Sequence, residues 1–326
     1  MNYIALPDSE SRKLPFYLAM EEYVAEKFSC DSFFLWQVAP TVIFGRNQVM
    51  ESEVNLAYCR RHGIQVYRRK SGGGCVYADL DNIMFSYIVP EDSVSTVFSA
   101  YTSRVASMLN AIGIPAHATG RNDIFIGDRK VSGNAFYHIP GRSIVHGTML
   151  YSTDIEAMVK ALSPSPSKLE SKGVESVRSH ITTLREHTSI SIEEFKAHVR
   201  DYMCDGVINL TEEDVAKIEE LSQHYYTPEW IYGKNPRFNR RISKRIEGVG
   251  EFFVELAVNR GHIESINLTG DFFQLGDIDS QLLDHLKGSE YSPEGIRRAI
   301  AGIATESIIS GLDNENLVNL IYNNHE

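Results

Sequence analysis

The sequence predicts an α+β fold. Segments with strand character come in runs, at about residues 64–89 and 123–151, instead of alternating strictly with helices as in a doubly wound fold. A hairpin pattern near 246–268, followed by helical segments, predicts a second and smaller α+β module. We therefore expect one large domain and one small one.

The elements of the large domain follow from local periodicity. Leu18, Val24 and Phe28 recur near helical spacing and predict a helix at about 15–28. Short apolar runs rich in aromatic and β-branched residues predict buried strands. The other expected helices cover about residues 53–62, 94–112, 154 onward, 191–205 and 211–224, and the expected strands cover 33–36, 42–44, 64–68, 75–78, 83–89, 123–126, 129–132 and 143–151.

A shift in composition at 234–245 predicts the boundary between the two domains. This stretch has six basic residues and no acidic ones, so we interpret it as a linker between domains at 1–240 and 246–326. After it, Asn259-Arg260-Gly261 predicts the turn of a hairpin. The strands of that hairpin are expected near 246–258 and 262–268, and helices near 277–287, 293–302 and 313–322.

Composition and charge exclude several classes of protein. The 326 residues carry a net charge of −11, which argues against nucleic-acid binding through a broad basic surface. There is no apolar run of about 18 residues and no basic, then apolar, N-terminal leader, so we expect neither a membrane-spanning nor a secreted protein. The four cysteines are widely spaced and are expected to be reduced thiols, as in a cytoplasmic protein.

The most informative stretch runs from Arg68 to Tyr77 and reads RRKSGGGCVY. Its three glycines leave backbone N–H groups unshielded, and its arginines supply fixed positive charge. Together they predict a loop that lies against a phosphate or a carboxylate. It matches neither the Walker A nor the dinucleotide-binding pattern, and a flexible turn remains the alternative.

Three further clusters carry polar groups suited to chemistry. Lys130 lies where a turn leads into a probable strand, shortly after the run Gly120-Arg121-Asn122-Asp123. His146-Gly147-Thr148 precedes an apolar strand. The stretch 163–180 is rich in Ser, Pro, Lys and Gly, and a long loop of this kind is more often functional than idle. Taken singly, each cluster also fits a structural or solvated role.

Taken together, these motifs resemble the lipoate–protein ligase A family, which is related to the biotin ligases. The resemblance covers nearly the whole chain. The matching stretches are Arg68 to Tyr77, Gly120 to Asp123, Lys130 to Ala135, His146 to Thr148, Ser171 to Ser179, Phe34 to Gln37, Gly45 to Gln48, Glu53 to Asn55, Trp230 to Pro236 and Gly270 to Phe273.

The resemblance implies a catalytic domain with a mixed or antiparallel sheet, a small accessory domain, and a reaction in two steps. Lipoate and ATP, with Mg²⁺, give lipoyl-AMP and pyrophosphate, and the lipoyl group then passes to a lysine of a lipoyl domain. By the same resemblance Lys130 is catalytic and Asp123 holds the metal. The implied ATP and adenylate site comprises Arg69, Gly74, Cys75, Val76, Tyr77, Asn122, Asp123, Lys172, Gly173, Val174, Ser176, Val177 and Arg178. The implied lipoate site comprises Arg68, Ser71, Gly72, Gly73, Lys130, Ser132, Gly133, His146 and Gly147.

The implied acceptors are the lipoyl domains of 2-oxoacid dehydrogenase E2 subunits and the glycine cleavage H protein, and the implied state is a monomer. This chain departs from the family at four positions that bear on acyl preference. Ala78 and Val145 stand where histidine is common, Asp81 where glycine is common, and Tyr137 where some relatives have arginine. A preference for lipoate or octanoate is left open.

Two other functions compete with the ligase. An ATP-independent octanoyl or lipoyl transferase would use a cysteine nucleophile, and Cys75 is the nearby candidate. A lipoate-binding protein without turnover would keep the pocket alone, but the presence of Lys130 argues against it. The basic stretch at 234–245 either steers an acidic lipoyl domain toward the site or is a solvated linker.

Overall fold

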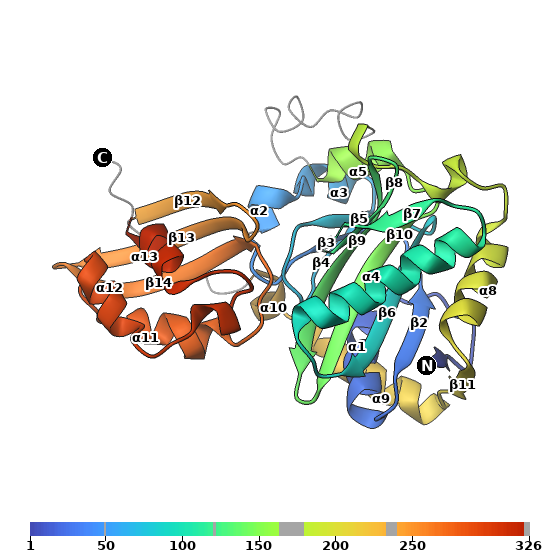
Figure 1. Ribbon diagram of the computed structural model, residues 1–326, viewed down its shortest axis with the longest axis horizontal. Coiled ribbons are helices and arrows are strands. Elements are labelled where there is room, and N and C mark those ends of the chain that lie inside the picture. The colour runs from blue at the N-terminus through green and yellow to red at the C-terminus, as the bar shows by residue number, and fades with distance from the viewer. Residues whose placement is uncertain (49, 120–121, 163–178, 233–239, 323–326) are drawn as a thin grey trace. The chain divides into compact units, whose positions relative to one another are not determined.

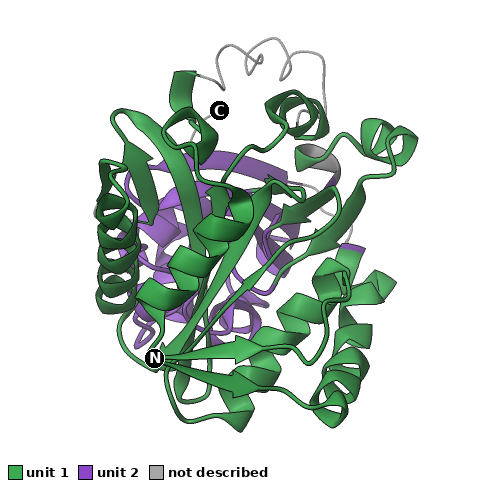
Figure 2. Cartoon of the chain, turned by 90° about the vertical axis from the view of Figure 1, so that its right-hand side faces the viewer, with its two compact units in different colours: residues 1–44, 51–69, 75–231 green, residues 45–50, 70–74, 232–326 purple. Residues whose placement is uncertain are grey.

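The computed structural model describes residues 1–48, 50–119, 122–162, 179–232 and 240–322. The chain divides into two compact units (Figures 1 and 2). Unit 1 comprises Met1–Phe44, Glu51–Arg69 and Cys75–Ile231, and unit 2 comprises Gly45–Met50, Lys70–Gly74 and Tyr232–Glu326.

A large mixed sheet forms the centre of unit 1, which confirms the predicted α+β class. Its strands are β1 (Asn2–Ala5), β2 (Ser32–Trp36), β6 (Asn82–Pro90), β7 (Ala116–Ala118), β8 (Asp123–Ile126), β9 (Arg129–Ile139), β10 (Arg142–Leu150) and β11 (Gly206–Asn209). They are ordered β11-β1-β2-β6-β10-β9-β8-β7. The pairs β1–β11 and β1–β2 are parallel, and the others are antiparallel.

Helices cover both faces of this sheet. On one face α1 (Leu14–Lys27), which has Pro15 in its first turn, packs against Phe34, Trp36 and Ile144. On the other face lies α4 (Val94–Ala111), whose Tyr101 ring lies 5.3 Å from that of Tyr87. Both helices were predicted. The remaining helical segments of unit 1 are α2 (Met50–Glu53, which begins in unit 2), α3 (Leu56–Arg61), α5 (Ile155–Ala161), η1 (Leu184–Glu186), α8 (Ile192–Met203), α9 (Glu212–Ser222), η2 (Gln223–Tyr226) and α10 (Pro228–Tyr232, which ends in unit 2).

A small sheet in unit 1 carries the two arginines that precede the glycine run. Its strands are β3 (Thr41–Phe44), β4 (Gln65–Arg68) and β5 (Val76–Ala78), with β3 in the middle. β3 is parallel to β4, so that Phe44 lies beside Arg68, and antiparallel to β5. The chain passes from unit 1 into unit 2 directly after β3 and one residue after β4.

Unit 2 contains an antiparallel sheet with helices on its apolar face. The strands are β12 (Arg240–Ile246), β13 (Gly250–Asn259) and β14 (His262–Asp271), and the helical segments are η3 (Asp279–Leu283), α11 (Asp284–Leu286), α12 (Pro293–Ala299), η4 (Thr305–Ser307) and α13 (Asn314–Ile321). Alternate residues of β13, among them Phe252, Val254 and Leu256, are buried in its core. The predicted turn at Asn259-Arg260-Gly261 is confirmed, with positive φ at Arg260 and Gly261.

Some predicted elements were wrong. The expected helix at 53–62 is two short helices, because the chain breaks at Val54 and Asn55 and Asn55 caps α3. The expected linker at 234–245 falls partly outside the described residues, and from Arg240 onward it is strand β12, paired with β13. β9 continues to Ile139, well beyond the expected strand at 129–132.

Candidate active site

The centre of the candidate site is the ion pair between Lys130 and Asp123. Asp123 begins β8 and Lys130 is the second residue of β9, and the two strands pair through an irregular register next to Phe125. Lys130 Nζ lies 2.8 Å from Asp123 Oδ1, and both side chains are partly exposed, at 36% and 26%. The lysine is therefore held by a carboxylate and still accessible to a ligand.

Gly133 leaves the room that Lys130 occupies. A Cβ on Gly133 would lie 2.7 Å from Lys130 Cε and 2.8 Å from Nζ, so any larger residue would force the lysine to move. The Gly133 N–H also donates to Thr148 Oγ1 at 3.2 Å, which ties β9 to β10. The lack of room for a Cβ explains why a glycine stands three residues after the lysine.

Two asparagines fix the chain around this ion pair. Asn122 Nδ2 donates to the Asn134 carbonyl at 2.8 Å, and Asn134 Nδ2 donates to the Asn122 carbonyl at 2.7 Å. Gly147 on β10 is required beside them, because a Cβ there would overlap Asn134 Oδ1. We call Asn122, Asp123, Lys130, Gly133 and Asn134 the lysine corner.

A fully buried carboxylate lies on the same face of the sheet. Glu21 Oε2 is 2.9 Å from His146 Nδ1 and accepts from the Tyr137 hydroxyl at 3.1 Å. Glu21 Oε1 accepts from Ser86 Oγ at 2.6 Å, and the Trp36 indole donates to Ser86. Burial raises the pKa of the Tyr137 hydroxyl well above its ordinary value, and the charge of Glu21 raises it further. These groups form a cluster of polar side chains that hydrogen-bond to one another and are surrounded by apolar side chains.

Arg68 and Arg69 lie at the end of β4, with their side chains against backbone carbonyls. Arg69 is 5% exposed and Nη1 donates to the Ile43 carbonyl at 3.0 Å. Arg68 is 8% exposed and donates to the Ile231 carbonyl through Nε and Nη2. Burial raises the pKa of the Cys75 thiol, and the nearby Arg69 charge offsets this only in part.

The glycine run lies within unit 2, against the end of β14. The Gly73 N–H donates to the Phe272 carbonyl at 3.0 Å, and its φ of +86° favours glycine. A Cβ on Gly72 would overlap that same carbonyl oxygen. Gly74 lies next to the Asp271 carboxylate, which would be 3.3 Å from a Cβ there. The glycines therefore allow a close backbone approach within unit 2.

The chain matches two families over most of its length. The Lipoyl protein ligase A/B catalytic domain matches residues 14–204, and the Bacterial lipoate protein ligase C-terminus matches residues 235–321. Lipoate-protein ligase LplJ of Bacillus subtilis is 36% identical over 318 residues, covering 94% of this chain and 96% of that protein. The chain belongs to the lipoate–protein ligase family.

Solved structures have the same fold as the ligase. P. falciparum LipL1, determined in complex with lipoate, has a TM-score of 0.76 at 22% identity and covers 98% of this chain and 97% of its own. A bipartite lipoate protein ligase from Thermoplasma acidophilum, determined in a study of that ligase and its E2 lipoyl domain, has a TM-score of 0.66 at 26% identity. It covers 74% of this chain and 100% of its own.

The structure of the ligase brings together only some of the site residues that the sequence predicts. Asn122, Asp123, Lys130, Ser132 and Gly133 converge at the start of β9, and Gly147 and His146 lie on the neighbouring strand β10. The predicted adenylate-loop residues Lys172, Gly173, Val174, Ser176, Val177 and Arg178 lie outside the described residues. Tyr77 and Val76 belong to β5 of the small sheet, and Ser71 to Gly74 belong to unit 2.

The buried cluster around Glu21 was missed by the sequence interpretation. An acidic residue among the apolar positions of the first helix was the available signal, since a carboxylate that faces a core needs donors there. Ser86 carried no signal in the sequence, because a serine in a strand is common.

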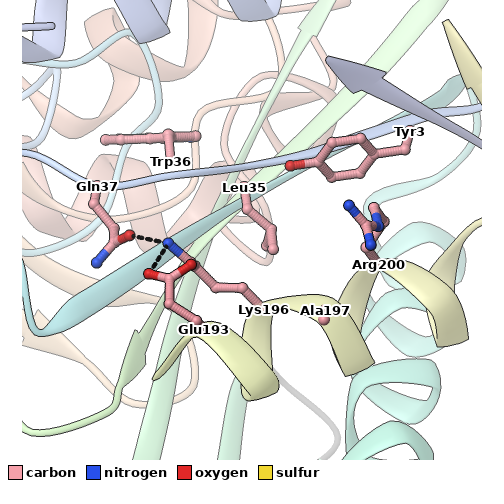
Figure 3. A pocket seen from close by; sticks show the side chains of 8 residues that line it. All are labelled: Tyr3, Leu35, Trp36, Gln37, Glu193, Lys196, Ala197 and Arg200. Atoms are coloured by element: carbon pink, nitrogen blue, oxygen red, sulfur yellow. Dashed lines mark hydrogen bonds and ion pairs between the residues drawn. The ribbon is translucent and has the colours of Figure 1, made fainter. Parts of the chain in front are cut away.

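A separate pocket lies on the opposite face of the sheet. It has a volume of about 290 Å³ and lies between α8 and strands β1 and β2 (Figure 3). Leu35 and Gln37 point toward α8, whereas the Trp36 side chain points away, on the face of the Glu21 cluster. The Lys196 ammonium already contacts Gln37 and Glu193. This pocket is therefore apart from the lysine corner.

Proposed function

We propose that this ligase activates free lipoate with ATP and then transfers the lipoyl group to a lysine of an acceptor protein. The observation that carries the proposal is the lysine corner, in which a partly exposed Lys130 is held by Asp123 over a glycine that leaves space for it. Forming an amide from a free carboxylate in water requires activation, and a mixed anhydride with AMP supplies it.

Activation brings two anions together, the lipoate carboxylate and the α-phosphate. A fixed cation between them stabilises the charge that develops on the phosphate during attack. Lys130 is the cation that the corner presents, and its ion pair with Asp123 holds it there. In this proposal Lys130 contacts both the acyl oxygen and the α-phosphate oxygen.

Asp123 fits the Mg²⁺ that accompanies ATP. Among the residues that the structure describes, no group of three His, Cys, Asp or Glu side chains is placed to hold a metal ion. Mg²⁺ at nucleotide sites commonly takes one or two carboxylates and completes its shell with phosphate oxygens and water. A single carboxylate beside the catalytic lysine suits that arrangement, and the ion would neutralise phosphate charge.

The lipoyl chain is proposed to lie on the face of the sheet that carries His146 and the Glu21 cluster. Trp36, Tyr137 and Ile144 on this face are buried and supply apolar surface. The His146 ring faces the same side, whereas the space next to Gly147 on the other side is filled by Asn134. We therefore propose that Gly147 contributes through its backbone, and that Tyr137 influences acyl preference.

The transferase alternative requires a reactive cysteine. Burial raises the pKa of the Cys75 thiol, so this residue is a protonated and weakly nucleophilic thiol near neutral pH. The partly exposed Lys130, held by Asp123, argues against the alternative of a non-catalytic binder. Both observations favour the ligase.

The proposed acceptors are lipoyl domains of E2 subunits and the H protein, and we propose a monomer acting in the cytoplasm. The T. acidophilum study supports a lipoyl domain as acceptor. No helix among the described residues has both the length and the apolar character needed to cross a bilayer. The exposed basic side chains of β12, such as Arg241, are proposed to steer an acidic acceptor.

The test is lipoylation of a purified apo lipoyl domain, followed by mass spectrometry. We expect one lipoyl group on one lysine when lipoate, ATP and Mg²⁺ are all present, and none when ATP is omitted. Modification from an acylated carrier protein without ATP would overturn the ligase in favour of the transferase. Acceptor KM at low salt that is unchanged by Arg241→Glu would contradict the steering role of β12.

A further inference from the structure

One arginine lies beside three of the places where the chain passes between the two units. The passages follow Phe44, Arg69 and Ile231, the last residues of three segments of unit 1. Arg68 is in register with Phe44, precedes Arg69 in the chain, and donates to the carbonyl of Ile231. All of these contacts lie within unit 1.

The Arg68 guanidinium is held from two sides. Its Cζ lies 4.6 Å from the centroid of the Phe44 ring, which is fully buried. Nε and Nη2 donate to the same Ile231 carbonyl oxygen, at 3.1 and 2.9 Å. This pair of hydrogen bonds to one oxygen needs a planar group with several fixed donors. The ammonium group of a lysine could not reproduce it.

Trp230 makes a further contact with Arg68, at its backbone. Its indole Nε1 donates to the Arg68 carbonyl at 3.0 Å. Its ring lies 4.6 Å from His224 and 5.5 Å from Tyr225, and the Tyr225 hydroxyl donates to Glu22 on α1. Trp230 is thereby anchored to the first helix, and through Arg68 to the end of β4.

We propose that Arg68 and Trp230 form a clamp that positions the start of the glycine run for adenylation. The clamp fixes the last residue of β4, Arg68. The N–H of the next residue, Arg69, donates to the Phe44 carbonyl. Two residues after Arg69, the Ser71 carbonyl accepts from the Arg46 N–H. Both residues are positioning residues, and Trp230 acts through Arg68.

The proposal rests on the proposed function, because positioning matters only if the run contributes to adenylate formation. Small misplacements of groups around reacting atoms cost far more in kcat than in binding. A direct contact of Arg68 with lipoate would instead act mainly through the KM for lipoate. The balance between kcat and KM therefore separates the clamp from a ligand contact.

The experiment compares Trp230→Phe, Arg68→Lys and the double variant in lipoate-dependent ATP–pyrophosphate exchange. Trp230→Phe keeps the aromatic packing and removes one hydrogen bond, so we expect kcat to fall roughly three- to tenfold, with the KM for lipoate within about twofold of wild type. Because both residues serve one clamp, the double variant should be no slower than the slower single variant.

Arg142→Lys is the matched control. Arg142 is 7% exposed and, like Arg68, donates to backbone carbonyls within unit 1, here those of Ser29 and Cys30. We expect this variant to keep its wild-type kcat. Equal losses in Arg142→Lys and Trp230→Phe would show general destabilisation and overturn the clamp, as would a wild-type kcat in Trp230→Phe or multiplicative losses in the double variant.

Amide hydrogen exchange of peptides covering 69–77 tests the clamp independently of activity. Amide hydrogens in these peptides should exchange faster in Trp230→Phe than in wild type or Arg142→Lys. An unchanged rate of amide hydrogen exchange in Trp230→Phe would overturn the clamp. If wild type shows no lipoate-dependent pyrophosphate exchange, the proposed function fails, and the amide exchange still decides whether the clamp exists.

Discussion

The lysine corner and the glycine run are held in different ways. The corner is fixed by side chains, with an ion pair from Asp123 and reciprocal amide contacts between Asn122 and Asn134. The run is fixed through its backbone, by the contact of Gly73 with the Phe272 carbonyl in unit 2. A corner held by side chains should tolerate changes that preserve charge and hydrogen bonding, whereas a run held by its backbone depends on the absence of side chains.

The largest effect is expected from Lys130→Ala. Removing the cation takes away the group proposed to stabilise the developing phosphate charge, so lipoate-dependent ATP–pyrophosphate exchange should fall by about 100-fold or more. The fold should survive, because the lysine is partly exposed and paired with one acid. Lys196→Ala is a suitable control, since Lys196 is also paired with an acid but lies on the opposite face, and it should stay active.

Gly72→Ala should have the next largest effect. The new methyl group would overlap the Phe272 carbonyl oxygen, so the glycine run must move. The rate of lipoate-dependent ATP–pyrophosphate exchange should therefore fall roughly 10- to 100-fold. Gly141→Ala provides the comparison, because Gly141 has a φ of +76° and open space around it. Its cost should appear as about 1–2 kcal/mol in the free energy of unfolding, with activity kept. Full activity in Gly72→Ala would show that the run does not need its close approach to Phe272.

Glu21→Gln tests whether the buried cluster around Glu21, on the same face of the sheet as the lysine corner, contributes to the stability of the fold. Glu21 accepts from Ser86 and Tyr137, and an amide cannot accept at both positions, so unfolding free energy should drop by about 1–3 kcal/mol. Urea denaturation measures this loss, with the exposed Glu26→Gln on the same helix as the reference. Equal stability of the two variants would mean that the cluster contributes no net energy.

The smallest effect is expected from Cys75→Ala. Since burial raises the pKa of the thiol, Cys75 stays protonated up to alkaline pH and should react slowly with iodoacetamide at pH 8. Ligation by the alanine variant should remain within about twofold of wild type, because the ligase needs no thiolate. Complete loss of lipoyl transfer in this variant would revive the cysteine-dependent transferase.

Much of the fold could be predicted from the sequence, and the failures have physical causes. Long periodic helices such as α1 and α4 were found, because many residues repeat the same signal. The short strands β1, β7 and β11 were missed, since their three or four residues include polar or small side chains and lack an apolar run such as that of β3. In β12 the basic composition concealed the alternation of Ile242 and Ile246 with exposed side chains.

The contacts of the candidate site could be predicted where the side chains that make them are near one another in the sequence. Asp123 and Lys130 are seven positions apart and lie across one turn, so the pair could be expected from the motif. The contact of Arg68 with Ile231 could not, because it joins residues 163 positions apart and uses a backbone carbonyl, which every residue has. The same holds for Gly73 and Phe272.

We propose that the lysine corner makes an acyl-adenylate. The most direct measurement is to incubate the protein with lipoate, Mg²⁺ and ATP labelled at the α-phosphate, without acceptor, and to separate the products. We expect labelled lipoyl-AMP that depends on lipoate, that is absent with Lys130→Ala and that disappears when an apo lipoyl domain is added. Lipoylation of that domain without any labelled adenylate, or adenylate formation undiminished in Lys130→Ala, would contradict the account.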